Sequence, residues 1–247
     1  MSFAAILMYH NIAPKPPPPA RLRWLHVDPG HFRFQMRYLK FAGFQVVSLK
    51  KILEFLATNK TDSKLVALTF DDAYLDFYEN AYPVLREFGY PATVYAVSDR
   101  VGKFNQWDSD ELKVQKKLMD WNQLGEMSRA GIEIGSHTRT HPFLAKTTLP
   151  EAQSEILDSR KMIEDKLGKP VHHFCYPYGS FTPDVRDLVA TSGYLSSVTV
   201  DRGSLRPGDD PYQLRRFMIK SQTLSFIYRM HSDYENRRGS PRPTPFP

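Results

Sequence analysis

Short apolar runs separated by helical patterns constrain the fold of this chain more than any other feature of its sequence. We predict six such runs as strands, at residues 4–8, 64–69, 93–97, 132–135, 173–176 and 195–200. Each run is nearly continuously apolar, which is typical of strands that are buried on both faces. Strands of this kind that alternate with helices predict a parallel sheet connected by crossover helices.

Capping residues mark where three of the helices begin and end. These helices span residues 28–43, 148–168 and 182–193, and each begins at Asp or Thr and ends at Gly. Thr148 and Glu151 also form a capping box. At least six strand–helix units fit into 247 residues, which favours a (β/α) barrel, with an open doubly wound sheet as the alternative.

Composition excludes several classes of protein. Hydrophobic residues make up 41% of the chain and charged residues 24%, as in ordinary folded proteins. The longest apolar stretch, residues 3–9, is far shorter than the ~20 residues of a membrane span, and no basic region precedes it as in a secretory signal. The single cysteine, Cys175, fits a reducing compartment. We therefore expect a cytoplasmic protein, and peripheral contact with the inner face of a membrane is left open.

The two flanks of the chain differ from its middle. Residues 14–19 are rich in proline and predict an extended surface loop. We expect residues 1–234 to form one domain and residues 235–247, which hold two adjacent arginines and four prolines, to form a flexible tail. The net charge of +6 permits an anionic partner, but with these arginines in a tail we expect no nucleic acid.

Polar residues that bind metals follow two of the predicted strands. Asp71 and Asp72 follow the second run, and His137 and His141 follow the fourth. Because the carboxyl ends of parallel strands gather at one edge, these side chains can meet. Zinc accepts His nitrogen and Asp oxygen, and catalytic sites use three protein ligands. The alternatives are acidic residues at a helix N-terminus and histidines with structural roles.

Aromatic residues are placed where a substrate could contact them. Residues 176–179 form a Pro- and Gly-shaped turn after a strand, which can present a backbone N–H to an anionic oxygen or simply end the strand. Residues 98–121 form a long connection, and such loops often bind substrate. Within it, Trp107 either stacks on a sugar ring or anchors the loop.

Three motifs in this order resemble those of the NodB-homology polysaccharide deacetylases, carbohydrate esterase family 4. They are Thr-Phe-Asp-Asp at 69–72, His-Thr-Arg-Thr-His at 137–141 and Tyr-Pro-Tyr-Gly at 176–179. The opening Met-Tyr-His-Asn at 8–11 is similar to a branch that includes deacetylases of poly-N-acetylglucosamine. The resemblance extends over residues 4–218, so the single predicted domain would be the catalytic one.

The resemblance implies a fold, a cofactor and a reaction. The fold is a distorted (β/α) barrel of NodB type, usually with seven strands. The cofactor is a divalent metal, usually zinc, held by Asp72, His137 and His141. Asp71 would be the general base, and the backbone N–H of Tyr178 would stabilise the oxyanion. The reaction is hydrolysis of an N-acetyl group on an amino sugar, and we expect Trp107, Tyr176 and Pro177 to contact this substrate.

The chain departs from the family pattern at four places. Cys175 occupies the position of an Arg that holds the catalytic Asp, and Ala73 replaces a usual Gly. No Asp-x-Trp motif is present near residues 200–203, and no Leu-x-His motif near 216–219. We expect Cys175 to be a buried thiol, in which case another residue must orient Asp71.

The missing Leu-x-His motif removes the usual general acid. We predict that His10, at the end of the first strand, replaces it, although a structural or substrate-orienting role is the alternative. His231 is a weaker candidate because it lies near a terminal helical pattern. His172 and His173 precede a strand, and we expect both at the surface.

The expected function is metal-dependent N-deacetylation of an amino sugar in a polysaccharide or glycan precursor. One alternative is a deacylase acting on a small, non-polymeric amide. The other is a catalytically weak glycan-binding pseudoenzyme, which the absence of the family's Arg, Asp-x-Trp and Leu-x-His residues suggests. Retention of Asp71 and of all three expected metal ligands argues against a pseudoenzyme.

Overall fold

The computed structural model describes residues 3–58, 64–109, 113, 115–220 and 226. The predicted tail at 235–247 and His231 lie outside these residues, so the boundary at residue 234 stays a prediction. Within the described part of the chain, no helix has the length and apolar character that crossing a bilayer requires.

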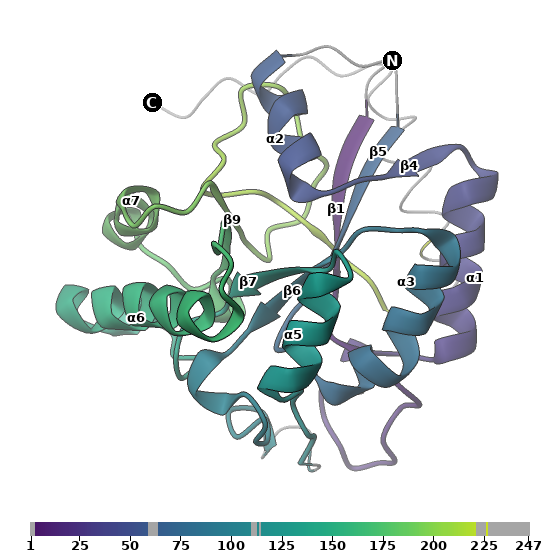
Figure 1. Cartoon of the computed structure of the whole chain (residues 1–247), viewed down its shortest axis with the longest axis horizontal. Helices are drawn as coiled ribbons and strands as arrows, with labels where there is room; N and C mark the ends of the chain where they lie inside the picture. The colour runs from purple at the N-terminus through teal and green to yellow at the C-terminus, as the bar shows by residue number, and fades with distance from the viewer. Residues whose placement is uncertain (1–2, 59–63, 110–112, 114, 221–225, 227–247) are drawn as a thin grey trace.

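The described residues form sixteen strands and helices, whose arrangement Figure 1 shows. The strands are β1 (Phe3–Tyr9), β2 (Asn11–Ile12), β3 (His26–Val27), β4 (Phe44–Val46), β5 (Lys64–Phe70), β6 (Thr93–Ala96), β7 (Glu133–Ser136), β8 (His173–Cys175), β9 (Ser196–Val198) and β10 (Phe217–Met218). The helices are α1 (Pro29–Phe41), α2 (Leu49–Thr58), α3 (Tyr82–Phe88), α5 (Trp121–Arg129), α6 (Leu149–Leu167) and α7 (Pro183–Thr191). Short 3-10 or π turns lie at Arg23–Leu25, Phe77–Ala81, Ser98–Arg100, Leu144–Lys146 and Pro177–Gly179.

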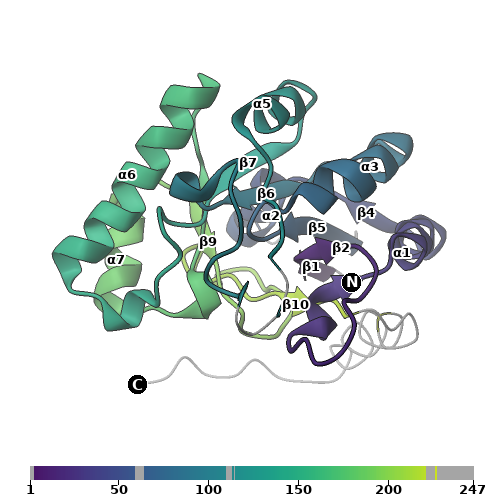
Figure 2. The same cartoon turned by 90° about the horizontal axis from the view of Figure 1, so that it is seen from below.

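The main sheet is parallel and follows the order β10–β1–β5–β6–β7–β8–β9. An eighth strand, β4, pairs with the beginning of β5, whereas β6 pairs with its end. The seven strands on the main path curl into a half-barrel with helices around the outside, as Figure 2 shows. Val198 at the end of β9 also pairs with Leu214, just before β10. The predicted distorted (β/α) barrel is therefore confirmed.

The two faces of the sheet are buried in different ways. On β1, Ala5 and Leu7 belong to the core that packs under the surrounding helices. Ala4 and Ile6 belong to a second core inside the curl, together with residues of α2. Helix α2 covers the end of the sheet where β1 and β5 begin (Figure 1). Because both faces are buried, the strands are apolar along their whole length.

All six predicted strands are confirmed, as β1 and β5 to β9, with ends that differ by at most two residues. The three predicted helices are α1, α6 and α7, and their caps form as expected. Asp28 accepts a hydrogen bond from the backbone N–H of Gly30 at 2.8 Å. Thr148 and Glu151 form the reciprocal capping box of α6.

The prediction that His172 and His173 both lie at the surface is wrong for His173. His173 is buried on β8, with Nε2 at 3.2 Å from a carboxylate oxygen of Glu133 on β7. Its Nδ1 lies 2.7 Å from the Ser196 hydroxyl on β9, while Thr93 on β6 donates to Glu133 at 3.1 Å. These four residues form a polar ladder across four neighbouring strands. His172, one residue earlier, is half-buried.

Candidate active site

The register of the sheet places the first site residues side by side. Tyr9 is paired with Phe70, so His10 and Asp71 leave the ends of β1 and β5 at the same level. The Asp71 backbone N–H donates to the Tyr9 carbonyl at 3.0 Å. Asp72 then adopts a left-handed backbone with φ of 70°, which directs the two adjacent carboxylates differently. Strained backbone of this kind is concentrated at functional sites.

Ala73 continues the left-handed turn, with φ of 56°. The family resemblance places a Gly here, which adopts such angles without steric cost. The Ala side chain is buried against the core. Because its φ is positive, Ala73 has a strained backbone at a position where Gly would have none.

The two histidines are brought together by a tight loop after β7. The His137 backbone N–H donates to the Ala96 carbonyl of β6 at 2.9 Å, which continues the sheet pairing. The Thr138 hydroxyl then accepts from the His141 backbone N–H at 3.0 Å, and His141 has a left-handed φ of 70°. As a result the two imidazole rings lie 4.7 Å apart between centroids.

Asp72, His137 and His141 form a buried cluster that fits a metal ion. One Asp72 oxygen, Oδ1, is 3.4 Å from Nε2 of each histidine, and it is buried without a hydrogen-bond partner. His137 Nδ1 lies 2.7 Å from the Cys175 carbonyl, which only accepts, so Nδ1 carries the proton and Nε2 is free to bind a metal. Burial lowers the pKa of His141 to about 4, which keeps this imidazole neutral. One carboxylate and two imidazoles are a ligand set that zinc accepts.

Asp71 forms hydrogen bonds with an arginine for which no role was predicted from the sequence. Arg216 is fully buried, and its Nη1 and Nη2 donate to the two Asp71 oxygens at 2.7 and 2.8 Å. The guanidinium also donates to the Thr199 carbonyl at 2.8 Å and to the Thr69 hydroxyl at 3.1 Å. Burial by itself would raise the pKa of the Asp71 carboxyl, but the charge and hydrogen bonds of Arg216 bring it below its ordinary value.

Arg216 explains the departure at Cys175. The Cys175 thiol is buried, as expected, and Arg216 Nη2 lies 3.3 Å from its sulfur. The arginine that orients Asp71 therefore comes from the residue before β10 instead of from the end of β8. The only sequence signal for this role is an arginine directly preceding the short apolar run at 217–219.

A pocket of about 280 Å³ lies over Asp71 and the Asp72–His137–His141 cluster. Seven predicted site residues border it: His10, Asp71, Asp72, His137, His141, Tyr176 and Tyr178. Six residues that had no predicted role also border it: Leu22, Trp24, Leu25, Asp108, Val200 and Met218. His10 Nε2 lies 3.9 Å from Asp71 Oδ2, so the predicted acid and base are neighbours.

The predicted aromatic contacts are placed unequally around this pocket. Trp107 is not among the residues that border it. Its ring stacks on the His141 ring, with 4.5 Å between the ring centroids. Pro177 is buried in the turn after β8, and Tyr176 donates its hydroxyl to the Tyr212 carbonyl at 3.1 Å. Tyr178 has a positive φ of 57° and contacts the edge of His141.

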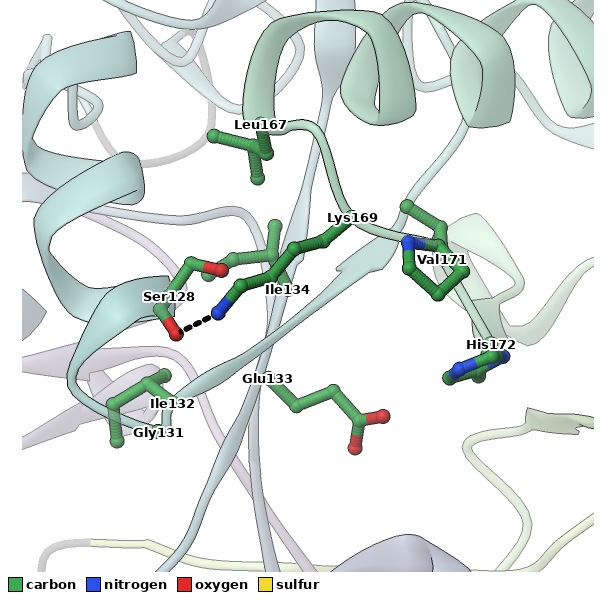
Figure 3. Close-up of a pocket in the computed structure, with 10 residues that line it drawn as sticks. Ser128, Gly131, Ile132, Glu133, Ile134, Leu167, Lys169, Val171 and His172 are labelled. Atoms are coloured by element: carbon green, nitrogen blue, oxygen red, sulfur yellow. Dashed lines mark hydrogen bonds between the residues drawn. The ribbon is translucent and has the colours of Figure 1, made fainter.

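A second pocket, of about 260 Å³, lies at the opposite end of β7 (Figure 3). Lys169 extends into it and donates to the Ser128 carbonyl at 2.6 Å, near the end of α5. A cation at this position stabilises the helix C-terminus. Glu133 and His172 also line the pocket, but Glu133 belongs to the polar ladder described above. This pocket therefore serves the structure of the sheet and helices.

The fold and the site together define a class of protein. The sheet is a curled (β/α) sheet, and an Asp–His–His cluster and a buried Asp–Arg pair lie at the carboxyl ends of its strands. This combination is typical of a metal-dependent hydrolase. The polysaccharide deacetylase family model matches residues 58–196, more than half of the chain. The protein belongs to the polysaccharide deacetylase family, as the motifs predicted.

Individual relatives agree with this assignment. The chain is 30% identical to Bacillus subtilis YxkH over 215 residues, which is 87% of this chain and 70% of that protein. It is 23% identical to the poly-beta-1,6-N-acetyl-D-glucosamine N-deacetylase of Staphylococcus epidermidis over 257 residues, covering 95% and 85% of the two chains.

Solved structures show the same fold. The deacetylase PplD of Streptococcus pyogenes, in complex with acetate, has a TM-score of 0.79 and 25% identity, covering 93% of this chain and 98% of its own. IcaB from Ammonifex degensii also has a TM-score of 0.79, with 23% identity and coverage of 92% and 95%. Both similarities extend over nearly the whole of each chain.

Proposed function

We propose that this protein hydrolyses the N-acetyl group of an amino sugar in a polysaccharide or glycan precursor, releasing acetate and leaving a free amine. The observation that supports this proposal is the arrangement of one pocket, in which the Asp72–His137–His141 cluster lies beside the Asp71–Arg216 pair. The names of two relatives are consistent with it, since one deacetylates an N-acetylglucosamine polymer and the other was solved with acetate.

Asp72, His137 and His141 would hold the metal, which we propose to be zinc. A divalent ion supplies two effects when bound, because it lowers the pKa of a water molecule and polarises a carbonyl. The protein contributes the buried setting of these ligands, since all three are less than a tenth exposed.

Four groups of the chain divide the proton transfers and charge stabilisation between them. Asp71 accepts a proton from the attacking water, and Arg216 keeps its carboxylate ionised and oriented. The backbone N–H of Tyr178 donates to the carbonyl oxygen as it becomes negative. His10, whose Nε2 lies 3.9 Å from Asp71 Oδ2, takes up this proton from Asp71 and gives it to the leaving nitrogen when the C–N bond breaks. Burial lowers the pKa of His10, and the charges of Asp71 and Asp72 partly oppose that shift.

Substrate contacts from the aromatic residues stay predictions. Tyr176 borders the pocket and is the best placed of the three. Trp107 and Pro177 are not among the residues that border the pocket. The pocket volume of about 280 Å³ is near the lower limit of ligand sites (~300–1,000 Å³), which suits one sugar unit better than a stretch of polymer.

The proposal is tested with two variants and a panel of acetylated substrates. Asp71→Asn should retain zinc but reduce acetate release by at least ~100-fold, because only the base is altered. His137→Ala should lose both zinc and activity. The panel should contain N-acetylated oligosaccharides, a nucleotide sugar and a small acetamide. Zinc is measured by mass spectrometry and acetate by an enzymatic assay.

Specific outcomes would contradict each part. Activity on the small acetamide alone would replace the carbohydrate proposal by the deacylase alternative. Loss of zinc from Asp71→Asn would show that ligand and base are assigned the wrong way round. An unchanged rate and pH profile in His10→Ala would remove His10 as the general acid.

A further inference from the structure

The active-site pocket contains a third carboxylate that the proposed mechanism does not use. Asp71 is bound by Arg216, and Asp72 lies between the two histidines. Asp108 borders the same pocket and is only 7% exposed. Among the described residues, the groups that could hold a metal contain Asp71 or Asp72 but not Asp108. Asp108 therefore faces the pocket without belonging to the metal cluster.

Two residues that precede Asp108 in its loop, Asn105 and Trp107, have defined contacts. Asn105 is fully buried, and its side-chain oxygen accepts from the Lys116 backbone N–H at 2.6 Å. The Lys116 amine in turn donates to the buried Asp76 carboxylate at 2.6 Å, which ties the loop to the chain after β5. Trp107, the neighbour of Asp108, stacks on the metal-cluster residue His141. These contacts place the residues that precede Asp108 beside the reaction centre.

The charge of Asp108 is felt inside the pocket. The pKa of the Tyr178 hydroxyl is raised, first by burial and then by the negative charges of Asp108 and Asp72. Tyr178 lines the pocket and contacts His141, so Asp108 lies within electrostatic range of the groups that surround the substrate.

A carboxylate at this position can only accept hydrogen bonds, and a sugar ring offers hydroxyl donors. Other parts of the wall, such as Trp24, Val200 and Met218, are apolar and suit the C–H face of a pyranose. The pocket has room for about one sugar unit, so a hydroxyl that reaches Asp108 belongs to the unit being deacetylated.

We propose that Asp108 is a specificity-determining residue, which accepts a hydrogen bond from a ring hydroxyl of the amino sugar whose N-acetyl group is cleaved. This inference rests on the proposed function, because it assigns Asp108 to the carbohydrate part of that substrate. It distinguishes sugar substrates from acetyl compounds that have no hydroxyls.

The test compares two substrates in the zinc-loaded enzyme. Asp108→Asn and Asp108→Ala should lower kcat/KM for an N-acetylglucosamine oligosaccharide by about 10- to 100-fold, the factor expected for a hydrogen bond to a charged group. The same variants should lower kcat/KM far less for a small aryl acetate ester, which has no ring hydroxyls for Asp108 to bind. Asp165→Ala removes an exposed carboxylate on α6 and is the matched control, with no change on either substrate.

Deoxy-sugar substrates provide a readout that a structural role would not change. In the wild type, removal of the one hydroxyl that contacts Asp108 should reduce kcat/KM about as much as Asp108→Asn does. In the variant, removal of that hydroxyl should have almost no further effect. Equal losses on sugar and aryl acetate, or the same deoxy-sugar losses in wild type and variant, would overturn the proposal. Absence of acetate release from every sugar by the wild type would instead contradict the proposed function.

Discussion

At the scale of single residues, Arg216 shows what a buried charge requires. An arginine without solvent is costly unless its donors are paired. Here the guanidinium donates to both Asp71 oxygens, to the Thr199 carbonyl and to the Thr69 hydroxyl. The pair keeps Asp71 ionised and in one orientation, and those are the two properties that a general base needs.

Removal of Arg216 should affect both stability and pH dependence. Arg216→Met leaves Asp71 buried and unpaired, which should reduce the free energy of unfolding by about 3–5 kcal/mol. Because Arg216 lowers the pKa of Asp71, its loss should raise that pKa. Asp71 would then be protonated at higher pH, so the acid limb of the kcat/KM profile should move upward. Urea unfolding and pH–rate profiles measure the two effects.

A second variant tests whether a guanidinium supplied from another position can orient Asp71 in place of Arg216. Cys175→Arg in the Arg216→Met background places a guanidinium where the family usually has one, beside the space that Arg216 vacates. We expect this double variant to recover part of the activity and to shift the acid limb back toward the wild type. An acid limb that is identical in wild type and Arg216→Met would contradict the assigned role.

At the scale of elements, the polar ladder joins four strands at the end of the sheet opposite the active site. Thr93, Glu133, His173 and Ser196 stand on β6, β7, β8 and β9, and their side chains form a continuous series of contacts. Strands β8 and β9 have only three residues each, so backbone pairing between them is limited. Side-chain contacts across the strands supplement it.

The ladder predicts how stability depends on pH. Burial would raise the pKa of Glu133, but its bond to His173 lowers it below its ordinary value. A lowered folded-state pKa stabilises the protein above the unfolded pKa of about 4.3, and this contribution is lost as the pH falls through the folded value. Glu133→Gln should therefore cost about 1 kcal/mol at pH 7, and the difference from wild type should shrink on acidification.

Thermal or urea unfolding between pH 7 and pH 3 measures this difference. Glu79→Gln, which removes an exposed carboxylate outside the ladder, is the control and should stay within ~0.5 kcal/mol of the wild type. A Glu133→Gln difference that is independent of pH would show that the carboxylate charge contributes nothing to the ladder.

At the scale of the whole molecule, the proposed metal site joins parts of the chain that are far apart in sequence. Asp72 follows β5, whereas His137 and His141 follow β7, two strands away in the sheet. A ligand that binds only the folded protein stabilises it by mass action. At a free zinc concentration of 100 times Kd the gain is about 2.7 kcal/mol.

Chelation should therefore lower the melting temperature by roughly 5–10 °C, given ~2–4 °C per kcal/mol for a domain of this size. Added zinc should restore it. Asp71→Asn should show the same zinc-dependent shift, because its ligands are intact, and His141→Ala should show little or none. A full shift in His141→Ala, measured by scanning calorimetry, would contradict the assigned ligand set.

The sequence predicted more of the fold than of the completed site. Long apolar runs and strong caps identified β1, β5 and α6, because their signals lie in consecutive residues. Strands β4 and β10, with three and two residues, are too short to produce a periodic pattern. His173 was placed at the surface because burial of a histidine depends on partners from neighbouring strands.

By itself, the sequence determined the parallel architecture, the family and the residues that form the Asp–His–His cluster, since each depends on local spacing and strand order. Only the tertiary structure decided which residue orients Asp71 and which residues complete the pocket wall. Arg216 and Asp71 are separated by 145 positions, and nothing in their local sequence links them. β10 pairs with β1, which pairs on its other side with β5. This order brings Arg216 to Asp71, and the need to pair a buried charge explains the contact between them.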